Sequence, residues 1–131
     1  MIHGGGHMTL SRKAVRPAQT SFLLTKGILP ISIDYRLCPL VNIIDGPMTD
    51  VRDAYTWAQQ DLPRILKGKL KVDPTKVVVI GWSTGGHLAM TTSWTTRAAS
   101  LTPPLAILSF YCPTNYDPSS KLTPDHSPIK R

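Results

Sequence analysis

Two glycine-rich segments, far apart in the chain, carry the residue types that acyl transfer through a serine requires. The first is His3-Gly4-Gly5-Gly6, and the second is Gly81-Trp82-Ser83-Thr84-Gly85. A serine hydroxyl is a useful nucleophile only when it is exposed, close to a base, and beside N–H donors for the oxyanion that develops on the substrate. The two segments predict the exposed serine and the donors.

The second segment has the Gly-x-Ser-x-Gly pattern of a sharp strand-to-helix turn. Gly81 and Gly85 lack the Cβ atoms that would collide where a strand reverses into a helix, so we expect Ser83 at an exposed apex. The same turn places the backbone N–H of Thr84 at a helix amino terminus, where it can donate to an oxyanion. Chance occurrence in a glycine-rich loop is the alternative, but the β-branched run Val77–Ile80 directly before it favours the catalytic turn.

The first segment predicts a loop whose backbone approaches the substrate closely, because successive glycines carry no side chains. Gly5 and Gly6 are the predicted oxyanion donors. His3 and Gly4 are predicted to support the loop, His3 through hydrogen bonds rather than by taking protons. A phosphate-binding loop is the alternative, but the sequence has neither a Gly-Lys-Ser/Thr ending nor a GxGxxG pattern.

Few histidines are available to serve as the base. His7 either lines the site or lies on an exposed loop, and we expect the ring of His87 to be packed and directed away from the serine hydroxyl. A Ser-Asp-His order is formally available with His126 and either Asp117 or Asp125, but these residues lie in a proline-rich stretch with no strand to hold them. We therefore expect the triad histidine and acid to come from sequence outside this chain.

The elements that must position these residues alternate between strand and helix, which predicts an α/β fold with a mostly parallel sheet flanked by helices. The expected helices span about 16–27, 48–58 and 84–97, and the expected strands span 31–34, 77–80 and 105–110. Asp45-Gly46-Pro47 is interpreted as a turn and cap, and Pro63 should end or kink the second helix. We assign residues 1–113 to the core and 114–131 to an irregular proline-rich tail.

Composition excludes several other classes of protein. The net charge is +7, but the basic residues are scattered and no aromatic platform lies among them, which argues against nucleic-acid binding. Cys38 and Cys112 form no metal or redox motif and are expected to be buried thiols. We expect no cofactor, no metal and no membrane span, and the lack of a visible signal segment favours a cytoplasmic location.

The chain resembles the hormone-sensitive-lipase-like branch of the α/β-hydrolase superfamily. The resemblance is carried by His3–Gly6, by Asp34–Pro39 after a strand, and by Gly81–Gly86. The stretch Met1–Met90 is also similar to the hydrolase or thioesterase module at the carboxyl end of some fungal polyketide synthases, which releases a polyketide by attacking a thioester.

The resemblance implies a partial α/β-hydrolase fold that lacks the first and last strands of the family and forms part of a larger polypeptide. It implies Ser83 as the nucleophile, and Gly5, Gly6 and the Thr84 amide as oxyanion donors for an ester or thioester substrate. Asp34 and Arg36 would be structural, whereas Trp82 departs from the acidic residue frequent in the family. Such a fragment would be weakly active or inactive. The alternatives are a non-catalytic small-molecule-binding protein on the same fold and a truncated product that does not fold stably.

Overall fold

The computed structural model describes residues 1–112 and residue 114, and its elements alternate as the sequence predicts. In chain order they are the 3-10 helix η1 (Arg12–Ala14), α1 (Pro17–Thr25), the π-helical turn η2 (Ile44–Met48), α2 (Thr49–Gln60), α3 (Leu62–Ile65), β1 (Val78–Trp82), α4 (Thr84–Ala98) and β2 (Ala106–Phe110). The three predicted helices and the predicted strands at 77–80 and 105–110 are confirmed. The second helix ends before Pro63, which lies in the first turn of α3.

The sheet is parallel and places the amino-terminal residues at its centre. β1 pairs with β2 in parallel from Val78 opposite Ala106 onward. On the other side of β1, Ile2 forms parallel bridges to both Gly81 and Ile33. The order across the sheet is therefore Ile33, Ile2, β1, β2. Because all of these segments run in the same direction, the glycine loop after Ile2 and the turn after β1 leave the sheet at the same edge.

The predicted strand at 31–34 is wrong in extent, because the structure reduces it to a single bridge at Ile33. The backbone there is paired only with Met1–Ile2, where the Met1 amine donates to the Ile31 carbonyl (2.8 Å) and the Ile33 amide donates to the Met1 carbonyl (3.2 Å). A strand requires a continuous ladder of backbone hydrogen bonds. The pairing segment, Met1–Ile2, leads directly into the glycine loop after Ile2. Residues 31–34 have the apolar pattern of a strand, but the segment that pairs with them is too short to extend the ladder.

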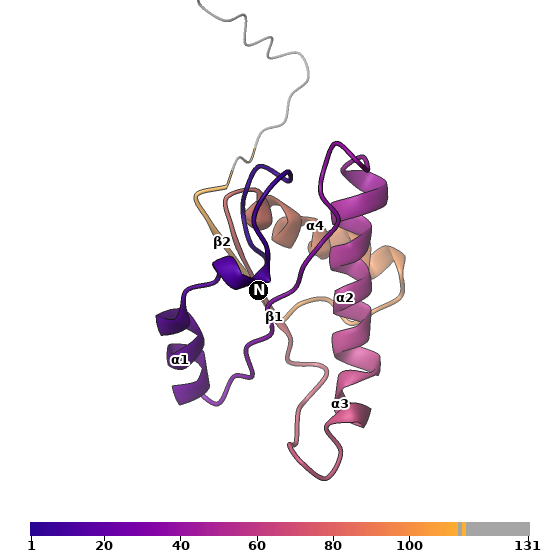
Figure 1. Ribbon diagram of the computed structural model, residues 1–131. Helices are drawn as coiled ribbons and strands as arrows, with labels where there is room; N and C mark the ends of the chain where they lie inside the picture. The colour runs from indigo at the N-terminus through magenta and orange to yellow at the C-terminus, as the bar shows by residue number, and fades with distance from the viewer. Residues whose placement is uncertain (113, 115–131) are drawn as a thin grey trace, which may run out of the picture.

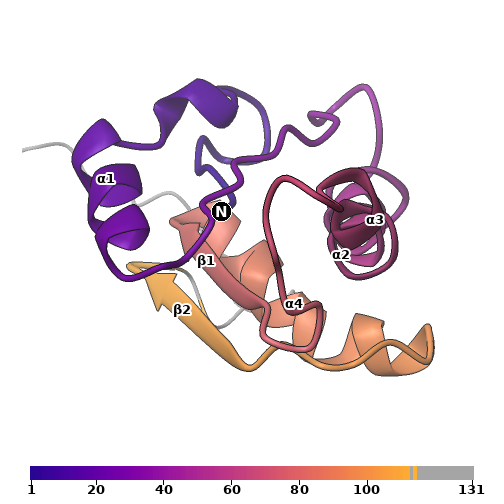
Figure 2. The ribbon, with the colours of Figure 1, turned by 90° about the horizontal axis from the view of Figure 1, so that it is seen from below.

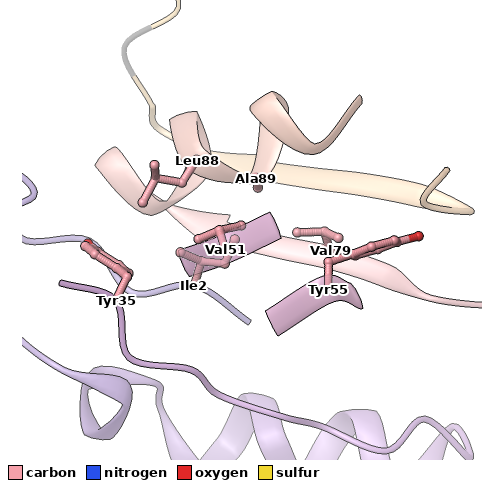
Figure 3. Close-up of a cluster of buried hydrophobic side chains, with 7 residues drawn as sticks. All are labelled: Ile2, Tyr35, Val51, Tyr55, Val79, Leu88 and Ala89. Atoms are coloured by element: carbon pink, nitrogen blue, oxygen red, sulfur yellow. The ribbon is translucent and has the colours of Figure 1, made fainter. Parts of the chain in front are cut away.

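Helices lie on both faces of the strand pair (Figures 1 and 2), with α1 on one side and α2 on the other. α4 packs on β1, β2 and α2. The buried apolar cluster in Figure 3 is drawn from the amino terminus, the segment after Ile33, α2, β1 and α4, and comprises Ile2, Tyr35, Val51, Tyr55, Val79, Leu88 and Ala89. Val51 and Tyr55 are the α2 residues whose helical spacing predicted this face. Among the described helices, none has an apolar run long enough to span a bilayer.

The start of the second helix differs from the prediction, because Asp45-Gly46-Pro47 belongs to the helical turn η2 rather than to a cap. Asn42 precedes this turn, and its Oδ1 accepts from the amides of Ile44 (2.9 Å) and Asp45 (2.8 Å). Pro47 has no N–H to donate, and the next amide, Met48, donates five residues back. The π-helical turn thus accommodates Pro47, and the helical structure continues from η2 into α2 without a break.

Candidate functional site

Ser83 lies between β1 and α4 in a backbone conformation that residues with side chains rarely adopt. Its φ is 53° and its ψ is −126°, and its side chain is half-exposed. Such a conformation costs about 1–3 kcal/mol and persists only where the surroundings hold it. Here the Ser83 amide donates to the Phe110 carbonyl (2.9 Å), and the Ser83 carbonyl accepts from the Gly86 amide (2.8 Å). The neighbouring strand and the following helix therefore both hold the turn.

The glycines around Ser83 are required by close backbone packing. A Cβ on Gly81 would collide with the backbone of Gly85, and a Cβ on Gly85 would collide with the carbonyls of Ile2 and His3. A Cβ on Gly86 would meet the side chains of the β2 end. The Gly-x-Ser-x-Gly pattern thus lets the turn approach both the glycine loop and β2.

The glycine loop lies directly against this turn. A Cβ added to Gly4 would lie 3.1 Å from the Ser83 Cβ and 2.9 Å from the Trp82 carbonyl oxygen. Gly5 and Gly6 follow with positive φ values of 103° and 64°, which glycine tolerates at no steric cost. Within the described part of the chain, neither the Gly5 nor the Gly6 amide donates a hydrogen bond. These amides are therefore available to a ligand.

Thr84 is the first residue of α4, so its amide has no acceptor within the helix. The positive end of the helix dipole adds to the attraction of an anion at this point. Strand, turn and helix thus place one further available amide next to Ser83. Thr84 adds an amide at a helix start to the available amides of Gly5 and Gly6, whose loop approaches Ser83 through Gly4.

The buried side chains of His3 and Tyr35 stabilise the glycine loop. His3 is 2% exposed, its Nδ1 lies 2.8 Å from the Gly4 carbonyl oxygen, and its ring stacks on Tyr35 with centroids 4.3 Å apart. The Tyr35 hydroxyl donates to the carbonyls of His3 (3.0 Å) and Gly4 (3.1 Å). Burial raises the pKa of Tyr35 to about 12, so the hydroxyl keeps its proton. Sequence reasoning missed Tyr35, although it stands between Asp34 and Arg36, which were singled out.

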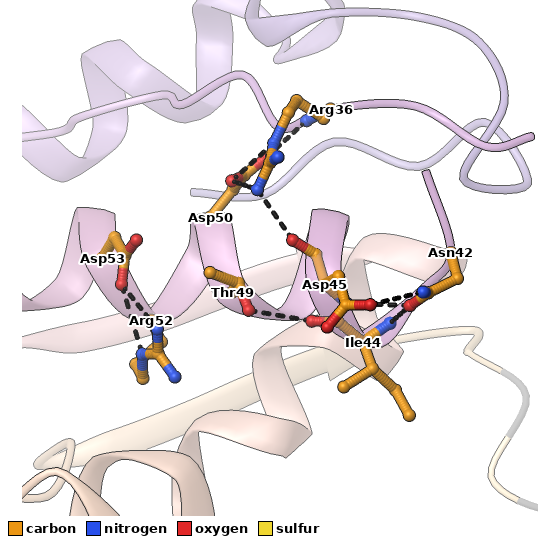
Figure 4. A network of polar contacts seen from close by, with 8 residues as sticks. All are labelled: Arg36, Asn42, Ile44, Asp45, Thr49, Asp50, Arg52 and Asp53. Carbon is orange, nitrogen blue, oxygen red and sulfur yellow. Dashed lines mark hydrogen bonds and ion pairs between the residues drawn. The ribbon is translucent and has the colours of Figure 1, made fainter. Parts of the chain in front are cut away.

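Arg36 ties this segment to the start of α2 (Figure 4). Its guanidinium bonds both carboxylate oxygens of Asp50 (2.8–3.0 Å) and donates to the Asp45 carbonyl (2.7 Å). Partial burial alone would raise the pKa of Asp50, but the hydrogen bonds from Arg36 hold it below its usual range. Asp34 accepts from the backbone and guanidinium of Arg12. Both residues connect segments of the chain rather than facing Ser83.

Two histidines lie near the start of α4, and neither is exposed. His7 is 5% exposed, and its ring lies edge-on to the ring of His87, with centroids 5.8 Å apart. Burial lowers the pKa of each. The alternative triad members Asp117, Asp125 and His126, like most of the predicted 114–131 tail, lie outside the described residues.

The described residues contain no group of three or more His, Cys, Asp or Glu side chains that could hold a metal ion. Cys38 and Cys112 are free and only half-buried, so the expectation of buried thiols is wrong. Cys112 lies at the end of β2, where its sulfur contacts Ser109 (2.9 Å) and Met90 (3.6 Å) instead of the interior.

A cavity of about 730 Å³ lies away from Ser83, towards the amino ends of the strands. Its lining is mainly apolar and comes from α1, the 27–33 segment, α2 and the start of β1. None of Gly5, Gly6, Ser83 or Thr84 lines it. The cavity and the serine site are therefore separate features of the sheet.

Comparison with known protein families identifies the family to which this architecture corresponds. The family described as the alpha/beta hydrolase fold matches residues 1–129. The chain belongs to that family. The predicted fold class is thereby confirmed, and the parallel strand pair with flanking helices is part of an alpha/beta hydrolase domain.

The most similar curated relatives include large fungal enzymes. The non-reducing polyketide synthase ascC of Acremonium egyptiacum is 67% identical over 93% of this chain but only 6% of its own length. The non-reducing polyketide synthase stbA of Stachybotrys bisbyi is 66% identical over 90% of this chain and 5% of its own length. These matches confirm the resemblance to polyketide synthases. No solved structure gives a significant match.

Proposed function

We propose that this chain is the acyl-binding part of a serine hydrolase that acts on carboxylic esters or thioesters. Ser83 attacks the substrate carbonyl, the bond to the alcohol or thiol breaks, and that leaving group departs with the serine proton to leave an acyl-enzyme. The amides of Gly5, Gly6 and Thr84 stabilise the oxyanion. The observation that carries the proposal is the close approach of Gly4 to the strained Ser83 turn, which supports a role for the amides of the same loop at the serine. Removing one such donor typically slows catalysis by about 100- to 1,000-fold.

The polyketide synthase relatives suggest the kind of polypeptide in which this reaction takes place. The chain spans 5–6% of the length of the polyketide synthases that it matches, so we infer that it is part of a larger polypeptide. In that setting the substrate is a polyketide thioester, and water releases the acid. The triad histidine and acid come from sequence outside the described residues.

The test is labelling of the 131-residue chain with a fluorophosphonate, together with hydrolysis of an acyl N-acetylcysteamine thioester. We expect slow labelling that Ser83→Ala abolishes and that Ser93→Ala leaves unchanged, because Ser93 is an exposed serine on α4, the helix that follows Ser83. A longer polypeptide that contains the downstream histidine and acid should react faster by about 10³-fold or more. Equal labelling of Ser83→Ala and the unchanged chain would refute the assignment of the nucleophile. Rapid stoichiometric labelling of the 131-residue chain would show that its base is present.

A second candidate function is non-catalytic binding of a small apolar molecule. The cavity of about 730 Å³ favours it, because ligand sites of this size are commonly concave and mostly apolar. Saturable binding of a fluorescent apolar dye that survives Ser83→Ala, without thioester turnover by either protein, would support this function over catalysis.

A further inference from the structure

The segment 35–38 holds the glycine loop on both sides of the two predicted oxyanion donors. Before the donors, the Tyr35 hydroxyl donates to two buried loop carbonyls (3.0 and 3.1 Å). After the donors, the Cys38 amide donates to the His7 carbonyl (2.8 Å). In the part of the chain that the structure describes, this is the one backbone–backbone hydrogen bond between residues 5–9 and any other segment. The segment 35–38 therefore positions the loop residues that carry the donors.

Arg36 lies between these two attachment points and joins the segment to α2 (Figure 4). The backbone amide of Arg36 donates to Oδ2 of Asp50 (2.7 Å), and its guanidinium donates to both Asp50 oxygens (2.8–3.0 Å). A carboxylate bound in this way also fixes the orientation of the guanidinium. A single side chain in the first turn of α2 thus binds both the main chain and the side chain of Arg36. The segment cannot shift along α2 without breaking these hydrogen bonds.

The Arg36–Asp50 pair differs from the neighbouring ion pair on α2. Asp53 accepts from the adjacent residue, Arg52 (3.0 and 3.2 Å), so that pair joins no separate segments. Arg36 and Asp50 are 14 positions apart. The Arg36 side chain is 55% exposed, and ion pairs with so exposed a member contribute little to the free energy of unfolding. The main consequence of the Arg36–Asp50 pair is therefore the position of the segment, and through it that of the loop.

We propose that Asp50 is a positioning residue for the oxyanion donors. Through Arg36 it fixes the segment 35–38 on α2, and the segment holds the glycine loop against the Ser83 turn. Asp50 acts through Arg36 and is not itself a catalytic residue. The effect on catalysis rests on the proposed function, whereas the connection from Asp50 to the loop does not.

Amide hydrogen exchange of the 131-residue chain tests the connection. Asp50→Ala removes the carboxylate that binds Arg36, and we expect protection of the Cys38 amide to fall by about tenfold or more, as for loss of a hydrogen bond to a charged group. The Leu105 amide donates to the Val77 carbonyl (2.8 Å) at the amino ends of the strands and should keep its protection. Asp50→Asn keeps one oxygen for the Arg36 amide, should lose less protection, and preserves the test if Asp50→Ala does not fold.

Asp53→Ala is the matched control. It removes the same charge from the same helix, and that charge also acts on Arg36, but the hydrogen bonds of Asp53 go to Arg52. We expect it to change Cys38 protection by less than about twofold. Unchanged Cys38 protection in Asp50→Ala, or an equal loss in Asp53→Ala or at Leu105, would overturn the connection.

Fluorophosphonate labelling separates this inference from the proposed function. If Ser83 reacts, Asp50→Ala should lower the limiting labelling rate by about tenfold or more. The reagent concentration that gives half of that rate should stay the same, because the loop amides act on the transition state.

The combined results identify which proposal fails. Loss of Cys38 protection without Ser83 labelling in any chain would support the connection and reject the hydrolase proposal. Ser83 labelling, with both readouts unchanged by Asp50→Ala, would do the reverse. Loss of Cys38 protection with unchanged Ser83 labelling would overturn the role of Asp50 in positioning the oxyanion donors.

Discussion

Two residues at this site have backbone conformations that residues with side chains rarely adopt. Ser83 has a φ of 53°, and His7 has a φ of 62°. Buried side chains form hydrogen bonds with carbonyls of the glycine loop. The Tyr35 hydroxyl, for example, donates to the carbonyls of His3 and Gly4. The strain is therefore offset by contacts from residues distant in the sequence.

Tyr35→Phe tests this support. The substitution keeps the ring stacked on His3 but removes the hydroxyl donor of the buried His3 carbonyl and one of the two contacts of the Gly4 carbonyl, so we expect the free energy of unfolding to fall by about 1–3 kcal/mol. Chemical denaturation followed by fluorescence measures the change. Tyr55→Phe is the matched control, because its hydroxyl donates to Thr102 instead (2.8 Å). If the proposed function holds, only Tyr35→Phe also slows Ser83 labelling, and equal labelling of both variants would argue against a role for Tyr35 in the loop.

At the scale of elements, the site depends on how closely β1, α4 and the glycine loop approach one another. The contact is made by backbone, because Gly85 packs on the carbonyls of Ile2 and His3. Behind it, Leu88 is fully buried in the cluster shared with β1 and α2. α4 therefore links the apolar core to the turn that carries Ser83.

Gly85→Ala should prevent this approach. The added methyl collides with main-chain carbonyls that cannot move aside without displacing the central bridge at Ile2, and we expect destabilisation of about 1–3 kcal/mol or more. Gly68→Ala is the comparison: its φ of 81° strains an alanine, but the added Cβ meets no atom within 4 Å, so Gly85→Ala should be the more destabilising of the two. Thermal unfolding of the two variants measures the difference. A Gly85→Ala chain as stable as Gly68→Ala would show that the close approach is not required.

Leu88→Ala tests the apolar side of the same helix. Truncation of a fully buried leucine removes transfer free energy and leaves a cavity, so we expect a loss of about 2–5 kcal/mol. Urea denaturation gives the value. A loss below about 1 kcal/mol would mean that α4 is not packed as the cluster implies.

At the scale of the whole molecule, one edge of the sheet is exposed among the described residues. β2 lies at the edge of the sheet, and Leu105, Leu108, Phe110 and Tyr111 are 40–77% exposed along it. A strand whose outer edge is unpaired and carries apolar side chains is a template for pairing with another chain.

Association through this edge should depend on concentration. Leu108→Lys places a charge on β2, and we expect it to reduce self-association of the 131-residue chain in sedimentation velocity. Leu70→Lys changes an equally apolar, exposed residue outside the strands and serves as the control. A chain that remains monomeric at all concentrations, or equal effects of the two variants, would contradict association through β2.

Stability should also depend on pH through His7, which is buried, and His87, which is half-buried. Their pKa values in the folded chain lie below the ordinary value of 6.5, so the unfolded chain binds more protons as the pH falls. The free energy of unfolding should therefore decrease as the pH drops below about 6.5. The α-amino group must be acetylated for this measurement, because burial lowers its pKa to about 6. A His7→Phe, His87→Phe double variant should lack this dependence, and an unchanged slope would assign it to other groups.

The sequence by itself determined the features that depend on neighbouring residues. The β-branched run before Ser83, the helical spacing of Val51 and Tyr55, and the glycines of the Ser83 turn predicted a strand, a helix and a sharp turn, because steric and periodic rules act over a few residues. The same motifs supported the α/β-hydrolase resemblance. The roles of Ser83, Gly5, Gly6 and Thr84 remain predictions.

Only the tertiary structure decided which distant segments meet. It placed Ile2 between Ile33 and β1, brought Tyr35 beneath the glycine loop, and paired His7 with His87. It also reduced the 31–34 strand to one bridge. Each of these outcomes joins segments that are far apart along the chain, and their pairing depends on the packing of the whole sheet. No local pattern encodes such contacts, because their free energy arises only when the intervening chain has folded.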